Sequence, residues 1–375
     1  DKVIRREFRL VEGDAYNPLL VDRAEKRIKQ LGFFKDVKVQ RQPGSAEDRV
    51  VIVVNITEQP TGELSFGAGY STSEGIIGDV SITERNLMGN GQFLRLKLGG
   101  SADRLQVDLS FTEPRFLDKN IAAGFDVFHK ELDLTSSSSN KTRRTGFVPR
   151  IGFPLSEDLW MSVNYTISRD EIYDVLPGAS LAVQNAVGTA LTSSVGLGLR
   201  YDTRNHPRNP NKGIYLSADA DFAGLGGDVQ YVRVQGEGRA YYPIFEKVTL
   251  VGRVVAGHIE GWGGEDVRLL DVFYRGGETV RGFDKAGFGP RDLGTGDALG
   301  GKSYWAANAE VRFPLPFLSE SLGMNGAVFA DAGSLFNAAE GDSVPGVLLA
   351  DDSSVRASVG ASIIWDSPLG PLRFD

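Results

Sequence analysis

The chain has 375 residues, a formal net charge of −8, no cysteine and 46 glycines. The lack of cysteine excludes disulfide scaffolds, thiol nucleophiles and cysteine-ligated metal sites, and an aromatic share of 10% is too high for a disordered chain. No stretch approaches the roughly 18 consecutive apolar residues of a transmembrane helix. A membrane β-barrel is not excluded, because its alternating strands average to a polar-looking hydropathy.

The start of the chain carries charges with no apolar segment behind them, unlike a signal peptide. This predicts either a cytosolic protein or a mature or trimmed piece of a longer one. The three histidines, His129, His206 and His258, lie far apart and lack ligand-like spacing, so no metal site is expected.

Residues 1–59 have the pattern of a small α+β module. Val3–Leu10 is expected to be a strand, and Asn17 with Pro18 supplies the N-cap and first turn of a helix that Gly32 ends. Two further strands are expected over Asp36–Gln42 and Arg49–Glu58. The module has 12 Lys and Arg against 10 Asp and Glu, which leaves a net charge of −10 for the rest. The boundary is expected at Gln59-Pro60.

From residue 61 onward the helical period gives way to alternation of apolar and polar residues. Leu105, Val107, Leu109 and Phe111 oppose polar residues, for example, and about fourteen such segments follow one another, with a partial one at the C-terminus. Many run to about ten residues, longer than the five or six usual in globular sheets. Their apolar faces end in aromatic residues, as the girdles of a membrane barrel do. A soluble β-sandwich or propeller is the alternative, but these features favour a barrel of about sixteen strands.

Short and long connections alternate along the barrel region, as in outer-membrane barrels with short turns at one end and long loops at the other. The long connections are expected at Asp133–Lys141, Asp170–Ala190, Glu260–Gly301 and Phe336–Ser353. We find no G-x-S-x-G, H-E-x-x-H or phosphate-binding loop motif in the sequence. No enzymatic activity and no cofactor are therefore expected.

The longest connection contains the run Val280-Arg281-Gly282-Phe283. A loop of about forty residues without a helical pattern indicates function. An arginine flanked by apolar residues predicts a tucked loop tip, whose guanidinium would need carboxylate partners on inward faces of the next strands. The alternative is a surface loop whose arginine is solvated.

This run resembles the V-R-G-F signature of the outer-membrane assembly factor family that includes BamA. Three further stretches agree with the resemblance: Leu31-Gly32-Phe33-Phe34 at a helix-to-strand hinge, Tyr201-Asp202-Thr203-Arg204 in the middle of the barrel region, and Trp365-Asp366-Ser367-Pro368-Leu369-Gly370-Pro371-Leu372 near the C-terminus. The resemblance implies a membrane-proximal POTRA domain over residues 1–59 and an outer-membrane β-barrel over residues 60–375. It also implies that Arg281 contacts Glu310 and Asp331, and Glu310 lies on the polar face by alternation alone.

The resemblance further implies a function: folding and inserting other β-barrels into the outer membrane without ATP, with the POTRA domain in the periplasm. The implied partners are unfolded barrel clients, accessory assembly lipoproteins, periplasmic chaperones and outer-membrane lipid, with no nucleic acid. A two-partner-secretion or Tam-type translocation pore is the alternative within the superfamily. A passive porin and a soluble β-rich enzyme are further alternatives, and a porin would need neither the loop motif nor the POTRA module.

The chain ends inside what the family pattern makes the next-to-last strand, so the final strand is expected to be absent. The first barrel strand would then have an unpaired edge. Glycines in this strand predict weak pairing at a lateral seam. The seam residues are expected to be Gly62, Leu64, Phe66, Gly67, Gly69 and Tyr70.

Overall fold

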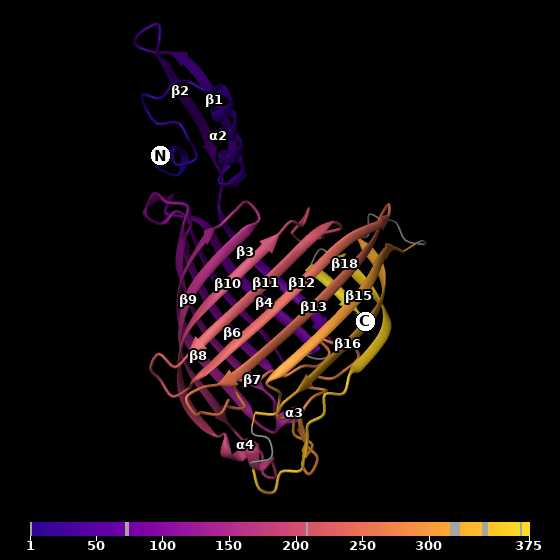
Figure 1. Ribbon diagram of the computed structural model, residues 1–375. Helices are drawn as coiled ribbons and strands as arrows, with labels where there is room; N and C mark the ends of the chain where they lie inside the picture. Colours follow the sequence, from indigo (N-terminus) through magenta and orange to yellow (C-terminus); the bar gives the residue numbers. More distant parts are fainter. Residues whose placement is uncertain (1, 72–74, 208, 316–322, 340–343, 368–369) are drawn as a thin grey trace.

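The computed structural model describes residues 2–71, 75–207, 209–315, 323–339, 344–367 and 370–375. A small N-terminal module stands at one end of a large barrel of tilted strands (Figure 1). None of the helices in these ranges is long and apolar enough to cross a membrane.

The N-terminal module packs one helix, α2 (Pro18–Gln30), on a hairpin of β1 (Phe34–Pro43) and β2 (Val50–Glu58). The Asn17 side chain caps α2 by accepting hydrogen bonds from the backbone N–H groups of Leu19 and Leu20. The helix buries Ala24 and Ile28 against the hairpin. The helix and both later strands of the module lie where the sequence pattern predicts them.

The strand expected over Val3–Leu10 is wrong. The chain forms a short helix, α1 (Lys2–Arg5), which ends in tight turns with Glu7 N–H bonded to the carbonyl of Ile4. Val3 and Glu7 are both buried, at 4% and 5% exposure. Their spacing of four residues is that of one helix face, and it outweighs the β-propensity of Val3 and Ile4.

The barrel is a single antiparallel sheet of fifteen strands in the described residues, each paired with its neighbours in chain order. The strands are β3 (Gly62–Ser71), β4 (Gly75–Leu87), β5 (Gln92–Ser101), β6 (Arg104–Glu113), β7 (Ala122–Asp133), β8 (Lys141–Pro154), β9 (Leu159–Tyr173), β10 (Gly188–Asp202), β11 (Gly213–Ala223), β12 (Tyr231–Phe245), β13 (Val248–Gly261), β15 (Ser303–Pro314), β16 (Met324–Phe336), β18 (Arg356–Ser367) and β19 (Gly370–Phe374). The predicted fold class is confirmed: the chain is mainly β, with a nearly closed antiparallel barrel of fifteen strands in the described residues, preceded by a small α+β domain.

Shorter elements lie in the connections. They are η1 (Phe116–Asp118), α3 (Thr135–Ser138), α4 (Leu181–Asn185) and a two-residue pairing of β14 (Arg291–Asp292) with β17 (Leu349–Ala350). The connection expected over Asp170–Ala190 is shorter than predicted, because β9 runs to Tyr173 and β10 begins at Gly188.

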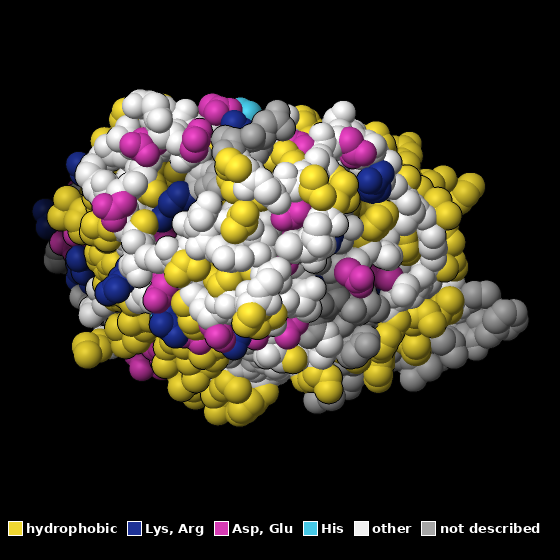
Figure 2. Space-filling view, turned by 90° about the horizontal axis from the view of Figure 1, so that it is seen from below, with side chains coloured by type: hydrophobic (Ala, Val, Ile, Leu, Met, Phe, Trp, Pro, Cys, Tyr) yellow, Lys and Arg dark blue, Asp and Glu magenta, His cyan; other side chains and the backbone are white. Residues whose placement is uncertain are grey.

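Alternation along the strands separates an apolar outer wall from a polar inner wall. Leu64 and Phe66 of β3, for example, are 58% and 69% exposed. Viewed from the end away from the N-terminal module, apolar side chains gather around the outer wall while charged side chains lie across the end face (Figure 2). Exposed apolar side chains in this arrangement fit a wall that faces lipid.

The two edges of the sheet meet without forming a ladder. β3 pairs along its whole length with β4, from Gly62 opposite Glu84 to Ser71 opposite Gly75. β19 pairs with β18 over the five residues of Gly370–Phe374. Some Cα atoms of β3 and β19 lie within 8 Å of each other, yet the described residues of these two strands share no strand pairing. The barrel is therefore nearly closed, with an edge on each side of one gap.

Candidate functional site

The connection between β13 and β15, residues 262–302, packs against the inner wall of the barrel. Its buried apolar side chains join inward-facing residues of the wall in one cluster, which includes Val272, Phe273, Val280 and Phe288 from the connection and Ile259, Tyr304, Ala306 and Leu335 from the strands. We call this connection the lumen loop. The lumen loop therefore lies inside the barrel and does not extend outward as a surface loop.

Arg281 at the tip of the lumen loop binds two carboxylates of the wall. Its Nε and Nη2 donate to Oδ2 and Oδ1 of Asp331, both at 2.6 Å, and its backbone N–H donates to the same Asp331 Oδ2 at 3.0 Å. Nη1 donates to Glu310 Oε2 at 2.6 Å. The guanidinium carbon also lies 3.5 Å from the ring centroid of Phe329. Two parallel bonds to one carboxylate fix the orientation of the arginine as well as its position.

The register of β15 and β16 brings the carboxylates of Glu310 and Asp331 together around Arg281. Asn308 is opposite Asp331 and Glu310 is opposite Phe329, so Glu310 and Asp331 are diagonal neighbours on one face of the sheet. Both side chains are nearly inaccessible, at 6% and 0% exposure, while that of Arg281 is 14% exposed. Buried charges at these positions are tolerated because each carboxylate has a charged hydrogen-bond donor.

The residues on either side of Arg281 hold the tip in shape. Val280 is fully buried in the apolar cluster, and Phe283 contacts Phe288 edge to face with ring centroids 5.5 Å apart. Gly282 has a φ of +87°, which L side chains rarely adopt. The tip therefore needs an apolar residue, the arginine, a glycine and an aromatic residue in this order.

A second anchor lies at the base of the lumen loop, and the sequence pattern does not predict it. Asp170 of β9 is 1% exposed and accepts hydrogen bonds from Arg144 Nε at 2.9 Å and Thr192 Oγ1 at 2.6 Å. Arg268 of the loop donates to the same carboxylate at 3.4 Å and to Asp271 at 2.7 Å. The alternation signal ends near Asp170, and nothing in the sequence relates it to a loop residue 98 positions away.

A third set of contacts holds the loop at the end of the barrel away from the N-terminal module. Ala298 N–H donates to the carbonyl of Ser137 at 2.7 Å, and Ser138 Oγ donates to the carbonyl of Ala298 at 2.9 Å. Asp297 accepts from Ser139 Oγ and from Ser180 N–H, both at 2.6 Å. The serine-rich connection therefore folds as α3 against the lumen loop, together with the start of α4.

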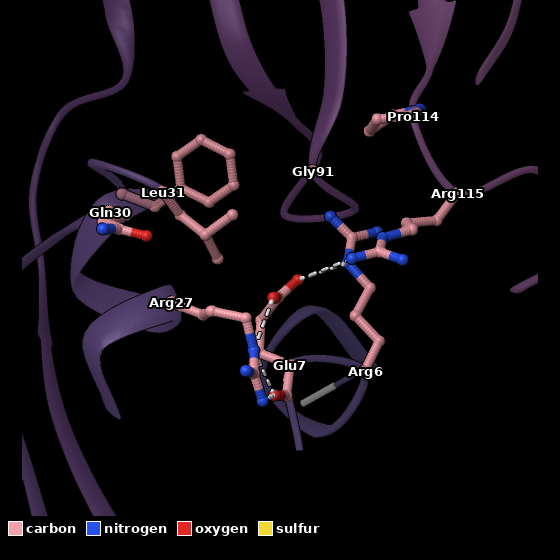
Figure 3. Close-up of a pocket in the computed structure, with 9 residues that line it drawn as sticks. Arg6, Glu7, Arg27, Gln30, Leu31, Gly91, Pro114 and Arg115 are labelled. Carbon is pink, nitrogen blue, oxygen red and sulfur yellow. Dashed lines mark hydrogen bonds and ion pairs between the residues drawn. The ribbon is translucent and has the colours of Figure 1, made fainter. Parts of the chain in front are cut away.

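A different charged cluster joins the N-terminal module to the barrel (Figure 3). Glu7 faces three arginines at nitrogen-to-oxygen distances of 3.7 Å for Arg6, 3.8 Å for Arg27 and 3.9 Å for Arg115. Arg115 belongs to the turn between β6 and β7 of the barrel, so Glu7 faces arginines from both the N-terminal module and the barrel. The cluster lines a cavity of about 270 Å³. We call it the junction cluster; the sequence pattern does not predict it.

The predicted seam residues all lie in β3, at one edge of the gap. Leu64 and Phe66 point outward, and a Cβ on Gly67 would lie 2.7 Å from Asp79 Oδ1, whereas one on Gly69 would meet no atom within 4 Å. Tyr70 pairs through its backbone with Ile76; its side chain lies outside the described part. No group of three or more His, Asp or Glu side chains in the described ranges has the arrangement of a metal site.

Comparison with protein-family models identifies both parts of the chain. A model of the Omp85 superfamily domain matches residues 86–375, and a POTRA model, described as a surface antigen variable number repeat, matches residues 1–59. These matches confirm the resemblance inferred from the loop motif and the hinge.

Curated relatives match the whole chain. The outer membrane protein assembly factor BamA of Neorickettsia risticii is 32% identical over 376 residues, which is 100% of this chain and 50% of the relative. BamA of Nitratidesulfovibrio vulgaris is 29% identical over 379 residues, covering 100% of this chain and 46% of the relative. The chain thus spans about half the length of the curated relatives it matches.

Solved structures agree. The crystal structure of BamA from Haemophilus ducreyi lacking POTRA domains 1–3 has a TM-score of 0.86 at 25% identity, covering 100% of this chain and 77% of that one. CdiB from Acinetobacter baumannii has a TM-score of 0.57 at 14% identity, covering 96% of this chain and 63% of that one, which shows the fold alone.

Proposed function

Because the chain belongs to the Omp85 superfamily, we propose that it is the membrane-embedded part of a machine that folds and inserts β-barrel proteins into the outer membrane. The observation that carries this proposal is the match of the entire chain to relatives named as outer membrane protein assembly factors, at 27–32% identity. Those relatives are named for assembly rather than for an enzymatic reaction.

The chain is an outer-membrane protein with its POTRA module in the periplasm. We propose that the POTRA domain covers residues 1–59 and the barrel residues 60–375, with the boundary at Gln59-Pro60. The turns at Gly89–Gly91 and Pro114–Asn120 lie at the periplasmic end in this orientation, and the lumen loop is held at the opposite end by α3 and α4.

The proposed mechanism uses the gap between β3 and the C-terminal edge of the sheet as a lateral seam. Among the described residues, β3 shares no strand ladder on the side away from β4. Such an edge can template an incoming strand by β-augmentation, in which backbone hydrogen bonds recognise many sequences. Exchange of these bonds needs no ATP, since each client strand that pairs replaces one set of hydrogen bonds with another.

The lumen loop has a supporting role in this proposal. Its tip binds Glu310 and Asp331 on β15 and β16, and its base binds Asp170 on β9. Arg281 would thus keep the part of the wall near the seam, at β15 and β16, in one shape while the seam changes. A rigid wall next to an exchangeable edge allows client strands to accumulate at a defined place.

The proposed partners follow from this role. They are unfolded outer-membrane β-barrel clients, accessory assembly lipoproteins, periplasmic chaperones and outer-membrane lipid, with no part for nucleic acid. The alternative, a two-partner-secretion or Tam-type translocation pore, is less favoured because the whole-chain relatives quoted above are named assembly factors.

The seam can be tested by crosslinking in proteoliposomes, because the chain has no native cysteine. One cysteine is placed in β3 and one in β19, at a pair of Cα atoms within 8 Å, and insertion of an unfolded barrel client is followed with and without reductant. We expect the oxidised protein to lose insertion and the reduced protein to regain it.

A matched disulfide serves as the control. Ser65→Cys with Ser81→Cys joins β3 to β4, which are already paired at these positions, so insertion should persist when it is oxidised. Undiminished insertion by the β3–β19 disulfide would overturn the seam mechanism.

A further inference from the structure

The charged cluster at the loop tip extends to the edge strand β19. Arg373 of β19 donates through Nη2 to Glu310 Oε2 at 2.7 Å and to Ser362 Oγ at 2.8 Å, and through Nε to Asp375 Oδ1 at 2.7 Å. Asp375 Oδ1 also lies 3.9 Å from Nη1 of Arg281. Glu310 therefore binds the loop tip and the edge strand at the same time.

This contact joins strands that share no ladder. The sheet order places β16 and β18 between β15 and β19. Strands in a sheet lie about 4.8 Å apart, so the two backbones are separated by about 14 Å along the wall. Long side chains cross the concave inner surface to bring Arg373 and Glu310 together. The contact is therefore a tether through the lumen.

Aromatic packing fills the space beneath the tether. Phe329 of β16 pairs in register with Gly360 of β18, and a Cβ on Gly360 would lie 2.5 Å from Phe329 Cζ. The Phe329 ring thus lies close to this glycine and also contacts the Arg281 guanidinium. A continuous path of contacts runs from the lumen loop through β16 and β18 to β19.

The charged side chains around the tether are balanced in number. The cluster contains three arginines and three acidic side chains, namely Arg281, Arg312, Arg373, Glu310, Asp331 and Asp375. Arg312 also binds Glu310, at 2.6 Å, but both lie on β15 two residues apart. Arg373 and Arg312 therefore supply the same charge to one carboxylate, and only Arg373 ties it to another strand.

We propose that Arg373 is a positioning residue that couples the C-terminal edge of the sheet to the anchored loop tip. This inference rests on the proposed lateral seam. Moving β19 outward, away from β15, must break the bonds of Arg373 to Glu310. Release of the tip must in turn loosen β19, because coupling between two sites is reciprocal.

The test uses a single thiol at the loop tip. Thr279 is 8% exposed and lines a polar lumen cavity of about 210 Å³, so the maleimide labelling rate of Thr279→Cys reports release of the tip. The rate is measured in Arg373→Met and in Arg312→Met as the matched control. Loss of charge-assisted bonds should raise the rate about tenfold or more in Arg373→Met, with a smaller change in Arg312→Met.

A second measurement separates coupling from general loosening. The cysteine at position 279 is kept chemically protected while a β3–β19 disulfide is formed to close the seam. It is deprotected only before labelling. Closure should slow tip labelling in the otherwise unaltered chain and in Arg312→Met, and should have no effect in Arg373→Met. Equal responses to closure in the two variants would overturn the proposal.

Two features keep the test decisive. If Arg373→Met fails to fold, Arg373→Lys keeps the charge but cannot bind Glu310, Ser362 and Asp375 together, and an intermediate labelling rate is expected. Labelling requires no client, so failure of the tether and failure of client insertion are observed separately.

Discussion

The loop-tip cluster and the junction cluster both surround carboxylates with arginines, yet they are built differently. At the tip, Arg281 makes three hydrogen bonds of 2.6 Å to Glu310 and Asp331, and positive and negative side chains are equal in number. At the junction, three arginines face the single carboxylate of Glu7 at 3.7 to 3.9 Å, and the shorter Lys2–Asp118 pair, at 3.0 Å, is exposed to solvent. The tip has the geometry of a fixed anchor, whereas from the longer contacts of Glu7 we expect the POTRA domain to change its angle more easily.

Position within the fold explains the difference. The tip carboxylates lie on adjacent strands of one sheet, whose register leaves their separation little freedom. Glu7 follows a one-turn helix, and its partner Arg115 lies in a turn of the barrel. An interaction between two separately folded parts tolerates longer and less directional contacts than one within a sheet.

Removing the tip arginine should have the largest effect. Arg281→Ala leaves the buried Asp331 without its arginine partner, which costs about 3–5 kcal/mol for a broken buried pair, while Glu310 keeps Arg312 and Arg373. We expect a lower free energy of unfolding in lipid vesicles and weakened client insertion, with the barrel still formed. Arg312→Ala is the control, since it leaves both bonds between loop and wall intact. Equal losses in the two variants would contradict the anchor.

The base anchor should rank second. Asp170→Asn keeps the shape of the side chain but removes the charge that binds Arg144 and Arg268, at a cost of about 1–3 kcal/mol. Faster proteolysis of the lumen loop should accompany the loss of stability. Glu171→Gln, on the next residue of β9, changes a side chain that is 29% exposed and should alter neither quantity. A matching effect there would remove Asp170 from the anchor.

The junction should respond in orientation rather than in barrel stability. Glu7→Gln removes the one negative charge among three arginines, so the arginines repel and the POTRA domain separates further from the turns. Proteinase cleavage near Gln59 should quicken while unfolding of the barrel is unchanged. A large loss of barrel stability would show that the junction is an anchor like the tip.

A pH effect on the lumen loop should be the smallest. Burial raises the pKa of Asp292, but hydrogen bonds from Gly294 and Leu348 N–H outweigh it and hold that pKa below its ordinary value of 3.8. The resulting stabilisation is complete above the ordinary pKa and is lost as the pH falls through the lowered one. Loop proteolysis should therefore quicken only in acid below about pH 4, and Asp292→Asn should remove the pH dependence.

Much of this architecture follows from periodicity. Alternation predicts the barrel strands and puts Glu310 on the polar face, and the Asn17-Pro18 start predicts α2, because these signals are local. The sequence does not predict the α1 helix, because its buried face consists of only Val3 and Glu7, too few residues to show a period.

Contacts between distant segments set the limit of prediction. The V-R-G-F motif singles out Arg281, and the family pattern implies its carboxylate partners, Glu310 and Asp331. Asp170 with Arg268, and Glu310 with Arg373, depend on how far each strand is shifted against its neighbours and on the curvature of the wall. A single sequence contains no signal for either quantity.

The contrast between a fixed tip and an adjustable junction can be measured directly by pulsed electron paramagnetic resonance. Spin labels on Gln40→Cys and Lys119→Cys report the distance from the POTRA domain to the barrel, and labels on Glu278→Cys and Lys119→Cys report the distance from the loop tip to the same barrel turn. We predict a broad distance distribution for the first pair that shifts in Glu7→Gln, and a narrow one for the second pair that does not. Equally narrow distributions, with neither changed by Glu7→Gln, would contradict the account.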